Sequence, residues 1–490
     1  MRTWDQIVGD LESLSSDLVA LTDEAREKAD TDTNPVPPDG DVIHVAPGED
    51  LQAALNAAPV GAVVELDAGG VYPGRVYVNR SVHLRTAGAA FDRRVTVEDG
   101  AAMARLADGL DVKPATVGVL LTALQFGPLN TDTIVNVGAG DSKQATVDAQ
   151  PVDVFVDQCL ILGHEVDGAK RGIGAHAKNL QITRTHIGDI FRAGQDTQAV
   201  GGWNGEGPFL IDDCCLEGAG ENVMFGGSDP AIPGLIPGDI TIRRSTIRKP
   251  LEWKQSNYTI KNLIEFKCGR RIVIEDNVLE NSWAAGQAYG LVITPSQYGK
   301  LPESTVEDYT FCRNVVTGLS GAFNILGHGQ HQNPNDDDYR PTQTSARITI
   351  TDNYFVVSKA ENGGQGWFMQ IGNGPIDLHV EHNTIEMDGN QFIQGNKPQG
   401  VPGFRFVGNI VRSIGEYGTS LNVNGTDEKD GAKWREYFPD GVMEGNAYSG
   451  DESVFRNNFP DDLHTPTAES GDLIVDGYGV GIWEGYGRRS

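Results

Sequence analysis

Residues 272–279, IVIEDNVL, carry the pattern that decides the fold. Apolar and polar residues alternate in two short stretches, and the small polar residue Asn277 stands where the stretches meet. Alternation of this kind is typical of β-strands with one buried face. The same pattern recurs between residues 154 and 448, so one pair of strands is repeated along most of the chain.

Ten copies of this pattern align, and the residue at the position of Asn277 is small and polar in each. The ten are Cys159, Thr185, Cys214, Ser245, Asn277, Asn314, Asn353, Asn383, Asn409 and Asn446. A unit that recurs every few tens of residues, as these ten positions do, is typical of solenoids. Stacked amides can hydrogen-bond from one copy to the next, and Asn tolerates the left-handed backbone of a sharp corner. We therefore predict an all-β fold, a right-handed parallel β-helix of about ten or more coils, with Asn at the left-handed corner. Cys159 and Cys214 share this column, which predicts small buried residues rather than nucleophiles.

The rest of the chain divides around this repeat. Residues 1–30 follow a heptad, with Trp4, Leu11 and Leu18 at one position and Ile7, Leu14 and Leu21 at the other. This spacing predicts a helix that is either packed on its own domain or used for attachment and coiled-coil assembly, with a homotrimer favoured. We expect a linker at 31–40, a cap and first coils at 41–150 with a short helix from Asp50 to Ala58, the main β-helix at 151–450, and a tail at 451–490.

Charge and cysteine content exclude several classes of function. The chain has 39 basic and 68 acidic residues and a net charge of −29, which opposes binding to nucleic acid or to an anionic membrane. Its five cysteines show no CxxC spacing, so neither a disulfide framework nor a metal site is predicted. Acidic residues interrupt the first 18 residues, where a signal peptide would be apolar. We expect an extracellular or virion-associated protein without a recognisable signal peptide.

The middle of the chain resembles bacterial right-handed β-helix proteins of the pectate-lyase-like superfamily. The resemblance rests on KRGIGAHAKNLQITRTHIGDI, on the stretch from GQDTQAVGGWNGEGP to IRKPLEW, on YTIKNLIEFKCGRRIVIEDNVLENSWA and on DLHVEHNTIEMDGN. It spans roughly residues 150–450 and implies the fold more securely than any activity. Ligands of this superfamily are usually elongated polysaccharides, and the helical N-terminus suggests a phage tailspike-type protein.

The repeat itself predicts a first candidate site. Three residues past the repeated position stand Glu217, Arg248 and Glu280 on consecutive coils, and Asp189 stands four residues past it. Coils stack at about 4.8 Å, so Glu217 and Glu280 are expected roughly 9–10 Å apart, near the upper end of the separation in an inverting glycosidase. An ordinary surface ladder of acid, base and acid gives the same pattern without catalysis.

A second candidate site combines a tryptophan with amides and acids, the composition of a sugar-binding surface. It comprises Asp196, Gln198, Trp203, Asn204, Glu206 and Glu221. The alternative is a glycine-rich turn ordered by its own polar side chains. Glu265 and Lys267 are expected on one face of the strand NLIEFK, paired with each other or with Lys254. Lys254 and Lys267 are further candidate substrate-binding residues. A lysine beside acids is a base only if desolvated, and a structural ion pair is the favoured alternative.

These features favour a glycan-binding, possibly glycan-degrading β-helix protein of the tailspike or surface-adhesin type. The alternatives are a soluble polysaccharide lyase or glycoside hydrolase and a non-catalytic structural β-helix. The expected partners are a polysaccharide or cell-surface glycan, other copies of the chain, and a larger assembly at the N-terminus. The cofactor is unknown; calcium at Asp336–Asp338 is one possibility, and a hydrated acidic loop is the other.

Overall fold

The computed structural model describes residues 41–295, 301–329, 343–389, 391–396, 400–413, 420–423, 437–444 and 446–449. The predicted N-terminal helix, the linker, the C-terminal tail and Asp336–Asp338 lie outside these residues, so the predictions made for them stay predictions. No helix in the described part is long and apolar enough to cross a membrane.

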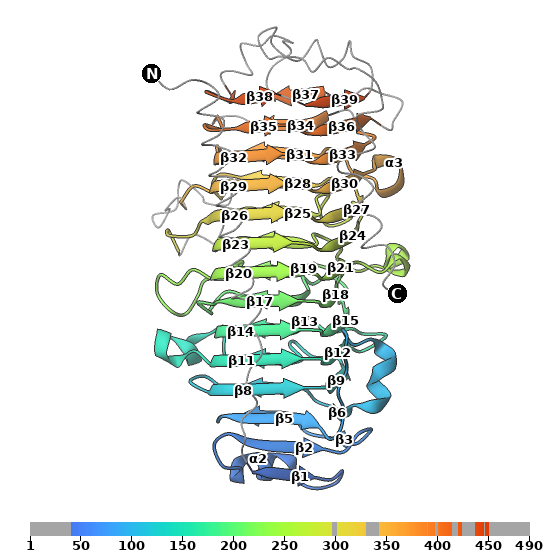
Figure 1. The fold of residues 1–490 in the computed structure, drawn as a ribbon, viewed down its shortest axis with the longest axis vertical. Coiled ribbons are helices and arrows are strands. Elements are labelled where there is room, and N and C mark those ends of the chain that lie inside the picture. Colours follow the sequence, from blue (N-terminus) through green and yellow to red (C-terminus); the bar gives the residue numbers. More distant parts are fainter. Residues whose placement is uncertain are drawn as a thin grey trace, which may run out of the picture. The chain divides into compact units, whose positions relative to one another are not determined.

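The described residues form three parallel β-sheets (Figure 1), which we call A, B and C. Sheet A has 14 strands: β1 (Val42–Val45), β2 (Ala62–Leu66), β5 (Val82–Thr86), β8 (Val117–Thr122), β11 (Val152–Asp157), β14 (Lys178–Thr183), β17 (Phe209–Asp212), β20 (Gly238–Arg243), β23 (Gly269–Glu275), β26 (Val306–Cys312), β29 (Ala346–Thr351), β32 (Ile376–Glu381), β35 (Arg405–Val407) and β38 (Val442–Glu444).

Sheet B has 13 strands: β3 (Val71–Tyr72), β6 (Ala104–Leu106), β9 (Leu124–Leu129), β12 (Leu160–Gly163), β15 (His186–Ile190), β18 (Cys215–Gly218), β21 (Thr246–Arg248), β24 (Val278–Ser282), β27 (Val315–Leu319), β30 (Tyr354–Val357), β33 (Thr384–Met387), β36 (Ile410–Ser413) and β39 (Ala447–Ser449). Sheet C has 12 strands: β4 (Val76–Val78), β7 (Leu110–Val112), β10 (Val135–Val137), β13 (Arg171–Ala175), β16 (Gln198–Gly202), β19 (Glu221–Phe225), β22 (Ile264–Phe266), β25 (Leu291–Ile293), β28 (Phe323–Leu326), β31 (Met369–Gly372), β34 (Gln391–Asn396) and β37 (Ser420–Val423).

One coil consists of a strand from each sheet, as in β11, β12 and β13, and the next coil begins with β14 directly beside β11. Parallel strands joined in this way follow the right-handed path that such connections almost always take. The structure therefore confirms an all-β parallel β-helix, and the right-handed turn predicted for it is the one that such connections take. Figure 1 shows the coils rising from β1 and β2 to β38.

The alternating pattern directs one column of side chains after another into the core. In sheet A, Ile272 lies beside Tyr309 and Ile274 beside Phe311 in the next coil, and all four side chains are buried. A residue at the same position in each coil therefore packs on its apolar counterparts above and below. This stacking makes one continuous core from many short strands, since each strand alone could bury little surface.

The ten predicted repeat positions are all buried, and the amides among them form a ladder. Asn277 Nδ2 donates to Asn314 Oδ1 at 3.0 Å, and Asn314 Nδ2 donates to Asn353 Oδ1 at 3.0 Å. The ladder continues from Asn383 to Asn409 at 3.0 Å. Ser245 also takes part, because its hydroxyl accepts from the backbone N–H of Cys214 at 2.9 Å. The burial predicted for Cys159 and Cys214 is confirmed, each being 0% exposed.

The prediction that Asn holds the left-handed corner was wrong. The left-handed residue is the one directly before the ladder position, and six of these residues alternate in charge along the sheet. They are Arg184, Asp213, Arg244, Asp276, Arg313 and Asp352, with φ between 47° and 58°. The reason is that the ladder side chain must point into the core, so the preceding residue makes the bend. Its side chain then faces outward, where Arg313 pairs with Asp276 at 2.8 Å.

The described part also contains short helices, one of which caps the first coils. The helix predicted from Asp50 to Ala58 is α2 (Leu51–Ala57), capped by the Asp50 carboxylate, and its Leu51 and Leu55 are buried. It lies at the first coils in Figure 1, as an end cap should. The remaining helices in the described part are η1 (Val97–Ala102), η2 (Ser142–Gln144), η3 (Val147–Ala149), η4 (Leu251–Gln255) and α3 (Lys359–Asn362).

Candidate functional site

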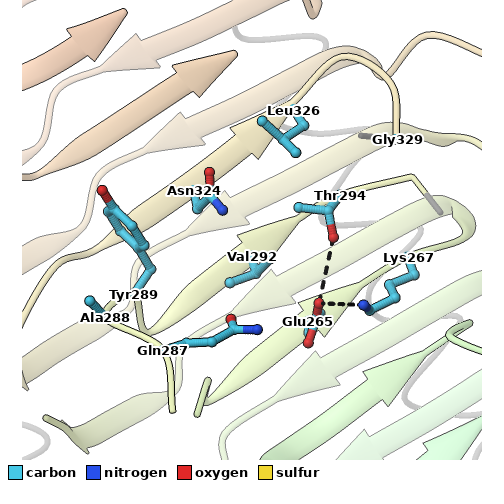
Figure 2. A pocket seen from close by; sticks show the side chains of 10 residues that line it. All are labelled: Glu265, Lys267, Gln287, Ala288, Tyr289, Val292, Thr294, Asn324, Leu326 and Gly329. Atoms are coloured by element: carbon cyan, nitrogen blue, oxygen red, sulfur yellow. Dashed lines mark hydrogen bonds and ion pairs between the residues drawn. The ribbon is translucent and has the colours of Figure 1, made fainter. Parts of the chain in front are cut away.

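A cavity of about 300 Å³ lies on the outer side of sheet C. Figure 2 shows the side chains around it, which come from β22, β25 and β28 and from the segments that follow or precede them. We call it the sheet C pocket. Its lining residues are Glu265, Lys267, Gln287, Ala288, Tyr289, Val292, Thr294, Asn324, Leu326 and Gly329.

Strand register explains why these residues meet. Glu265 pairs in register with Val292 of the next coil, and Val292 pairs with Asn324 of the coil after that. Their flanking residues, such as Ile264 and Leu291, point into the core, so this column points outward. Residues far apart in sequence thus become neighbours at steps of about 4.8 Å.

The carboxyl group of Glu265 is the chemically unusual group of the pocket. Its Oε1 lies 3.3 Å from Lys267 Nζ and 3.5 Å from the hydroxyl of Thr294, as Figure 2 shows. Its Oε2 is buried and has no hydrogen-bond partner among the described residues. Burial raises the pKa of Glu265 to about 7, with a further contribution from the negative charge of Glu221 and opposition from Lys267. Near neutral pH this carboxyl group can both give and take a proton.

The predicted pairing of Glu265 with Lys267 is confirmed, but the suggested partnership with Lys254 was wrong. Lys254 lies on η4, and its Nζ donates to the backbone oxygen of Glu361 at 2.8 Å. It also lies 5.9 Å from the ring of Trp283. Helix η4 follows β21 of sheet B, and Lys254 contacts α3 through Glu361 and Asn362.

A row of polar side chains continues from the pocket along the preceding coils of sheet C. Glu221 accepts from Gln198 Nε2 at 2.8 Å and lies 3.5 Å from Lys261 Nζ. Lys261 also pairs with Asp196 at 2.6 Å, and Gln198 accepts from Arg171 at 2.8 Å. The structure therefore brings together Asp196, Gln198 and Glu221 of the second predicted site.

Two other residues of that predicted site, Asn204 and Glu206, are held in structural contacts. Asn204 is fully buried, and its amide donates to the backbone oxygens of Ala139 and Gln144. Glu206 accepts from Gln150 at 3.1 Å and pairs with Lys178 at 3.2 Å.

Trp203 does not form an open platform for a sugar ring. Its N–H donates to Gly140 at 2.9 Å, the Arg171 guanidinium lies over its ring at 4.9 Å, and the His176 ring meets it edge-on at 4.4 Å.

The first predicted site lies on sheet B, with the register expected for it. Glu217 pairs in register with Arg248, and Arg248 with Glu280. Arg248 Nη2 binds Glu217 Oε1 at 2.7 Å, so Glu217 is engaged in an ion pair at the buried end of the column. Asp189 is half-buried, and burial together with Glu217 raises its pKa to about 6. The sheet C pocket includes neither Glu217 nor Glu280.

Sequence reasoning missed the pocket residues Tyr289, Thr294 and Asn324 and the neighbouring Arg171 and Lys261. Tyr289 donates from its hydroxyl to Gln370 at 2.8 Å. These residues stand outside the repeated pattern, which was aligned on the corner between sheets A and B. A second alignment on sheet C strands, such as NLIEFK with YGLVIT, would have placed Glu265 over Val292.

The raised pKa of Glu265 predicts how stability changes with pH. In the folded protein this carboxyl group holds its proton up to a pH of about 7, against an ordinary value of 4.5, so protonation favours the folded state. Stability from this group is complete below a pH of about 4.5 and is lost as the pH rises through about 7. We expect the urea midpoint of the wild type to be lower at a pH of about 8 than at about 5. In Glu265→Gln the part of this difference that comes from Glu265 should disappear. An unchanged dependence in the variant would contradict the assignment.

Comparison with known proteins gives similarity to solved β-helix structures only. No protein-family model matches the chain, and no curated protein matches it in sequence. A mannuronic acid-specific polysaccharide family 6 lyase from human gut microbiota is 12% identical, with a TM-score of 0.43 over 86% of this chain and 90% of that chain. A GH87 α-1,3-glucanase from Streptomyces thermodiastaticus is 15% identical, with a TM-score of 0.47 over 85% of this chain and 69% of that chain.

A tailspike protein of the E. coli bacteriophage HK620 is 11% identical, with a TM-score of 0.45 over 84% of this chain and 65% of that chain. Identities and scores this low carry no argument about activity. The three long parallel sheets show, by their own arrangement, that the described part of the chain is a parallel β-helix.

Proposed function

We propose that the chain binds a polysaccharide along the outer face of sheet C and cleaves it at Glu265 and Lys267. The observation that carries this proposal is a cavity in which a buried carboxyl group with a free oxygen lies 3.3 Å from a lysine. A carboxyl group whose pKa is raised to about 7 is suited to acid–base catalysis near neutral pH. The polar row from Arg171 to Lys261 supplies further hydrogen-bonding groups for neighbouring sugar units.

The composition of the pocket favours β-elimination over hydrolysis. Most glycosidases need two carboxyl groups flanking the scissile bond. Glu265 is the one carboxylate among the described lining residues, and Glu221 is already held by Gln198 and Lys261. An amine beside a protonated carboxyl group fits the removal of a proton next to the carboxylate of a uronic acid.

In this reaction the neutral form of Lys267 takes the proton, and the electron pair of the broken C–H bond forms a C=C bond. The glycosidic C–O bond breaks, and its oxygen leaves with a proton from solvent. Glu265, while protonated, donates a hydrogen bond to the substrate carboxylate and so stabilises the developing negative charge.

The test is turnover of a panel of uronic-acid polysaccharides and neutral glucans by the full chain. Unsaturated products are followed by ultraviolet absorbance, and total cleavage by new reducing ends. We expect absorbing products from a uronic-acid polymer, and a loss of about 100-fold or more in turnover for Lys267→Met and for Glu265→Gln.

Asp111 and Lys113 provide a matched control, because they also stand two residues apart on sheet C, with 3.4 Å between their charged groups. Lys113→Met should leave turnover unchanged, since this pair lies outside the pocket. Reducing ends without ultraviolet absorbance would contradict elimination. Binding without any product would contradict cleavage, and it is the result expected of a non-catalytic adhesin or spacer.

Loss of turnover in Glu217→Gln and Glu280→Gln, with Lys267→Met fully active, would instead place the chemistry on sheet B. The tailspike-type assembly inferred from residues 1–30 is a separate proposal. Sedimentation of the full chain tests it, with a trimer expected and a monomer contradicting it.

A further inference from the structure

A cluster of three potential metal ligands lies on sheet B, away from the sheet C pocket. It consists of His186 at the start of β15 and of Cys215 and Glu217 on β18, and we call it the sheet B triad. His186 and Cys215 are direct partners in the parallel register of adjacent coils. One ligand atom from each of the three residues lies within 4.8 Å of the others. All three are buried, with exposures of 7%, 8% and 8%.

Two of these side chains have no hydrogen-bond partner in the described part of the chain. Neither the His186 ring nor the Cys215 thiol takes part in a hydrogen bond there, and the nearest carboxylate oxygen to His186 Nε2 is Glu217 Oε2, at 4.0 Å. The neighbouring Cys214 differs, because its thiol lies 3.4 Å from the backbone oxygen of Ile182. Buried polar groups are nearly always bonded. The donor atoms of the triad are therefore available to a ligand.

Glycine at position 188 keeps the space between these donors free. Gly188 lies on β15, two residues after His186. A Cβ built there would stand 2.8 Å from His186 Nε2 and 3.2 Å from Glu217 Oε2. Its φ is not in the left-handed region, so the backbone does not require glycine. The missing side chain leaves a small space onto which two of the donors converge.

Neighbouring arginines orient the triad without occupying it. Arg248 binds Glu217 Oε1 at 2.7 Å, which leaves Oε2 facing His186. Arg94 is engaged by the backbone oxygen of Cys214 at 2.8 Å and by the hydroxyl of Thr246 at 3.2 Å. Burial, helped by both arginines, lowers the pKa of His186 to about 4.

We propose that the sheet B triad is a binding site for a transition-metal dication of the Zn²⁺ class, with His186, Cys215 and Glu217 as its three protein ligands. Nitrogen, thiolate and carboxylate are the ligands that zinc selects, whereas calcium prefers oxygen alone. Zinc–ligand bonds of about 2.0–2.3 Å put tetrahedral ligands roughly 3.3–3.8 Å apart. Side-chain rotations that close the triad by up to about 1 Å would therefore complete it. The fourth position is left for water or another ligand.

The test uses Zn²⁺ and Co²⁺ alone with the full chain. A thiolate ligand gives Co²⁺ an intense near-ultraviolet charge-transfer band, and a tetrahedral site gives it strong visible bands. We expect both for the wild type, and a rise in thermal midpoint on addition of Zn²⁺. Cys215→Ser should abolish the charge-transfer band, and His186→Gln should weaken Zn²⁺ binding by about 100-fold or more in competition with a chromophoric chelator.

Gly188→Ala tests the geometry without touching a ligand. Its methyl group would fill the space beside His186 Nε2, and we expect Zn²⁺ affinity to fall by about 10-fold or more. Cys312→Ser is the matched control, because Cys312 is also buried and lies 4.0 Å from a carboxylate oxygen of Glu275. It should keep the cobalt bands. Far-ultraviolet circular dichroism confirms the fold of every variant.

The proposal is overturned if the wild type binds no Zn²⁺ at millimolar concentration, or if Cys215→Ser keeps the charge-transfer band. Equal affinity of wild type and Gly188→Ala would also count against this geometry. Because the assay measures metal binding alone, its result does not depend on the activity proposed for sheet C.

Discussion

Replacing Asn353 with alanine is expected to destabilise the β-helix by about 3–5 kcal/mol. The two N–H groups of Asn353 Nδ2 are shared among Phe311 O at 2.9 Å, Thr351 O at 2.8 Å and Asn383 Oδ1 at 2.9 Å. Its Oδ1 accepts from the backbone N–H of Asn314 at 2.8 Å and from the Asn314 amide at 3.0 Å. Alanine would leave these groups without partners in a buried column, and each unmet bond costs about 1 kcal/mol or more.

Denaturant unfolding followed by circular dichroism measures this loss. The exposed Asn56 on α2, whose Oδ1 accepts from Gln52 at 3.1 Å, is the control, and Asn56→Ala should stay within about 0.5 kcal/mol of wild type. A ladder variant as stable as this control would mean that the amide column contributes little. Because solenoids can unfold in parts, midpoints at several probes should be compared.

A loss of similar size, about 3–5 kcal/mol, is expected for Lys249→Met. The Lys249 side chain is fully buried, and the three N–H groups of its Nζ are shared among five oxygens at 2.7–3.1 Å, which are Gly218 O, Ala219 O, Gly220 O, Asn262 O and Asn222 Oδ1. Burial lowers the pKa of this amine to about 7, and the negative charge of Glu221 opposes the shift. Methionine matches the length of the side chain but leaves the five oxygens facing an apolar group.

The turn between β18 and β19 depends on this lysine, because three of the five acceptors are consecutive backbone oxygens at residues 218–220. Thermal unfolding checks the prediction, with Lys143→Met as the control, since Lys143 is exposed and lies 3.8 Å from Asp141. Equal thermal midpoints for the two variants would show that the turn forms without the lysine.

The fold could be predicted because its main determinant is local and repeated. Each Asn of the ladder lies between two short alternating strands, so a single alignment revealed both the coil and its buried column. The backbone of the corner could not be predicted in the same way. Asn is a common left-handed residue, and only the structure shows that Asp276, not Asn277, makes the bend.

The sites were harder to predict because they depend on register between coils. Glu217, Arg248 and Glu280 were placed correctly in one column, since all three were counted from the ladder. The Glu265 pocket needed the register of sheet C, where turns of varying length precede each strand. His186 and Cys215 were missed as a pair for a different reason: they lie on separate coils, and no short motif in the sequence joins them.

The alternating charges beside the ladder have a consequence for how the chain folds. From Arg184 to Asp352, basic and acidic residues take turns at the left-handed corner, one in each coil. During folding, a coil that skipped its proper neighbour and paired with the following one would set arginine against arginine or aspartate against aspartate. Such like-charge contacts between adjacent strands are destabilising. The apolar columns are too similar to distinguish one coil from the next. The alternating corner charges therefore disfavour a misfolded register in which one coil is skipped.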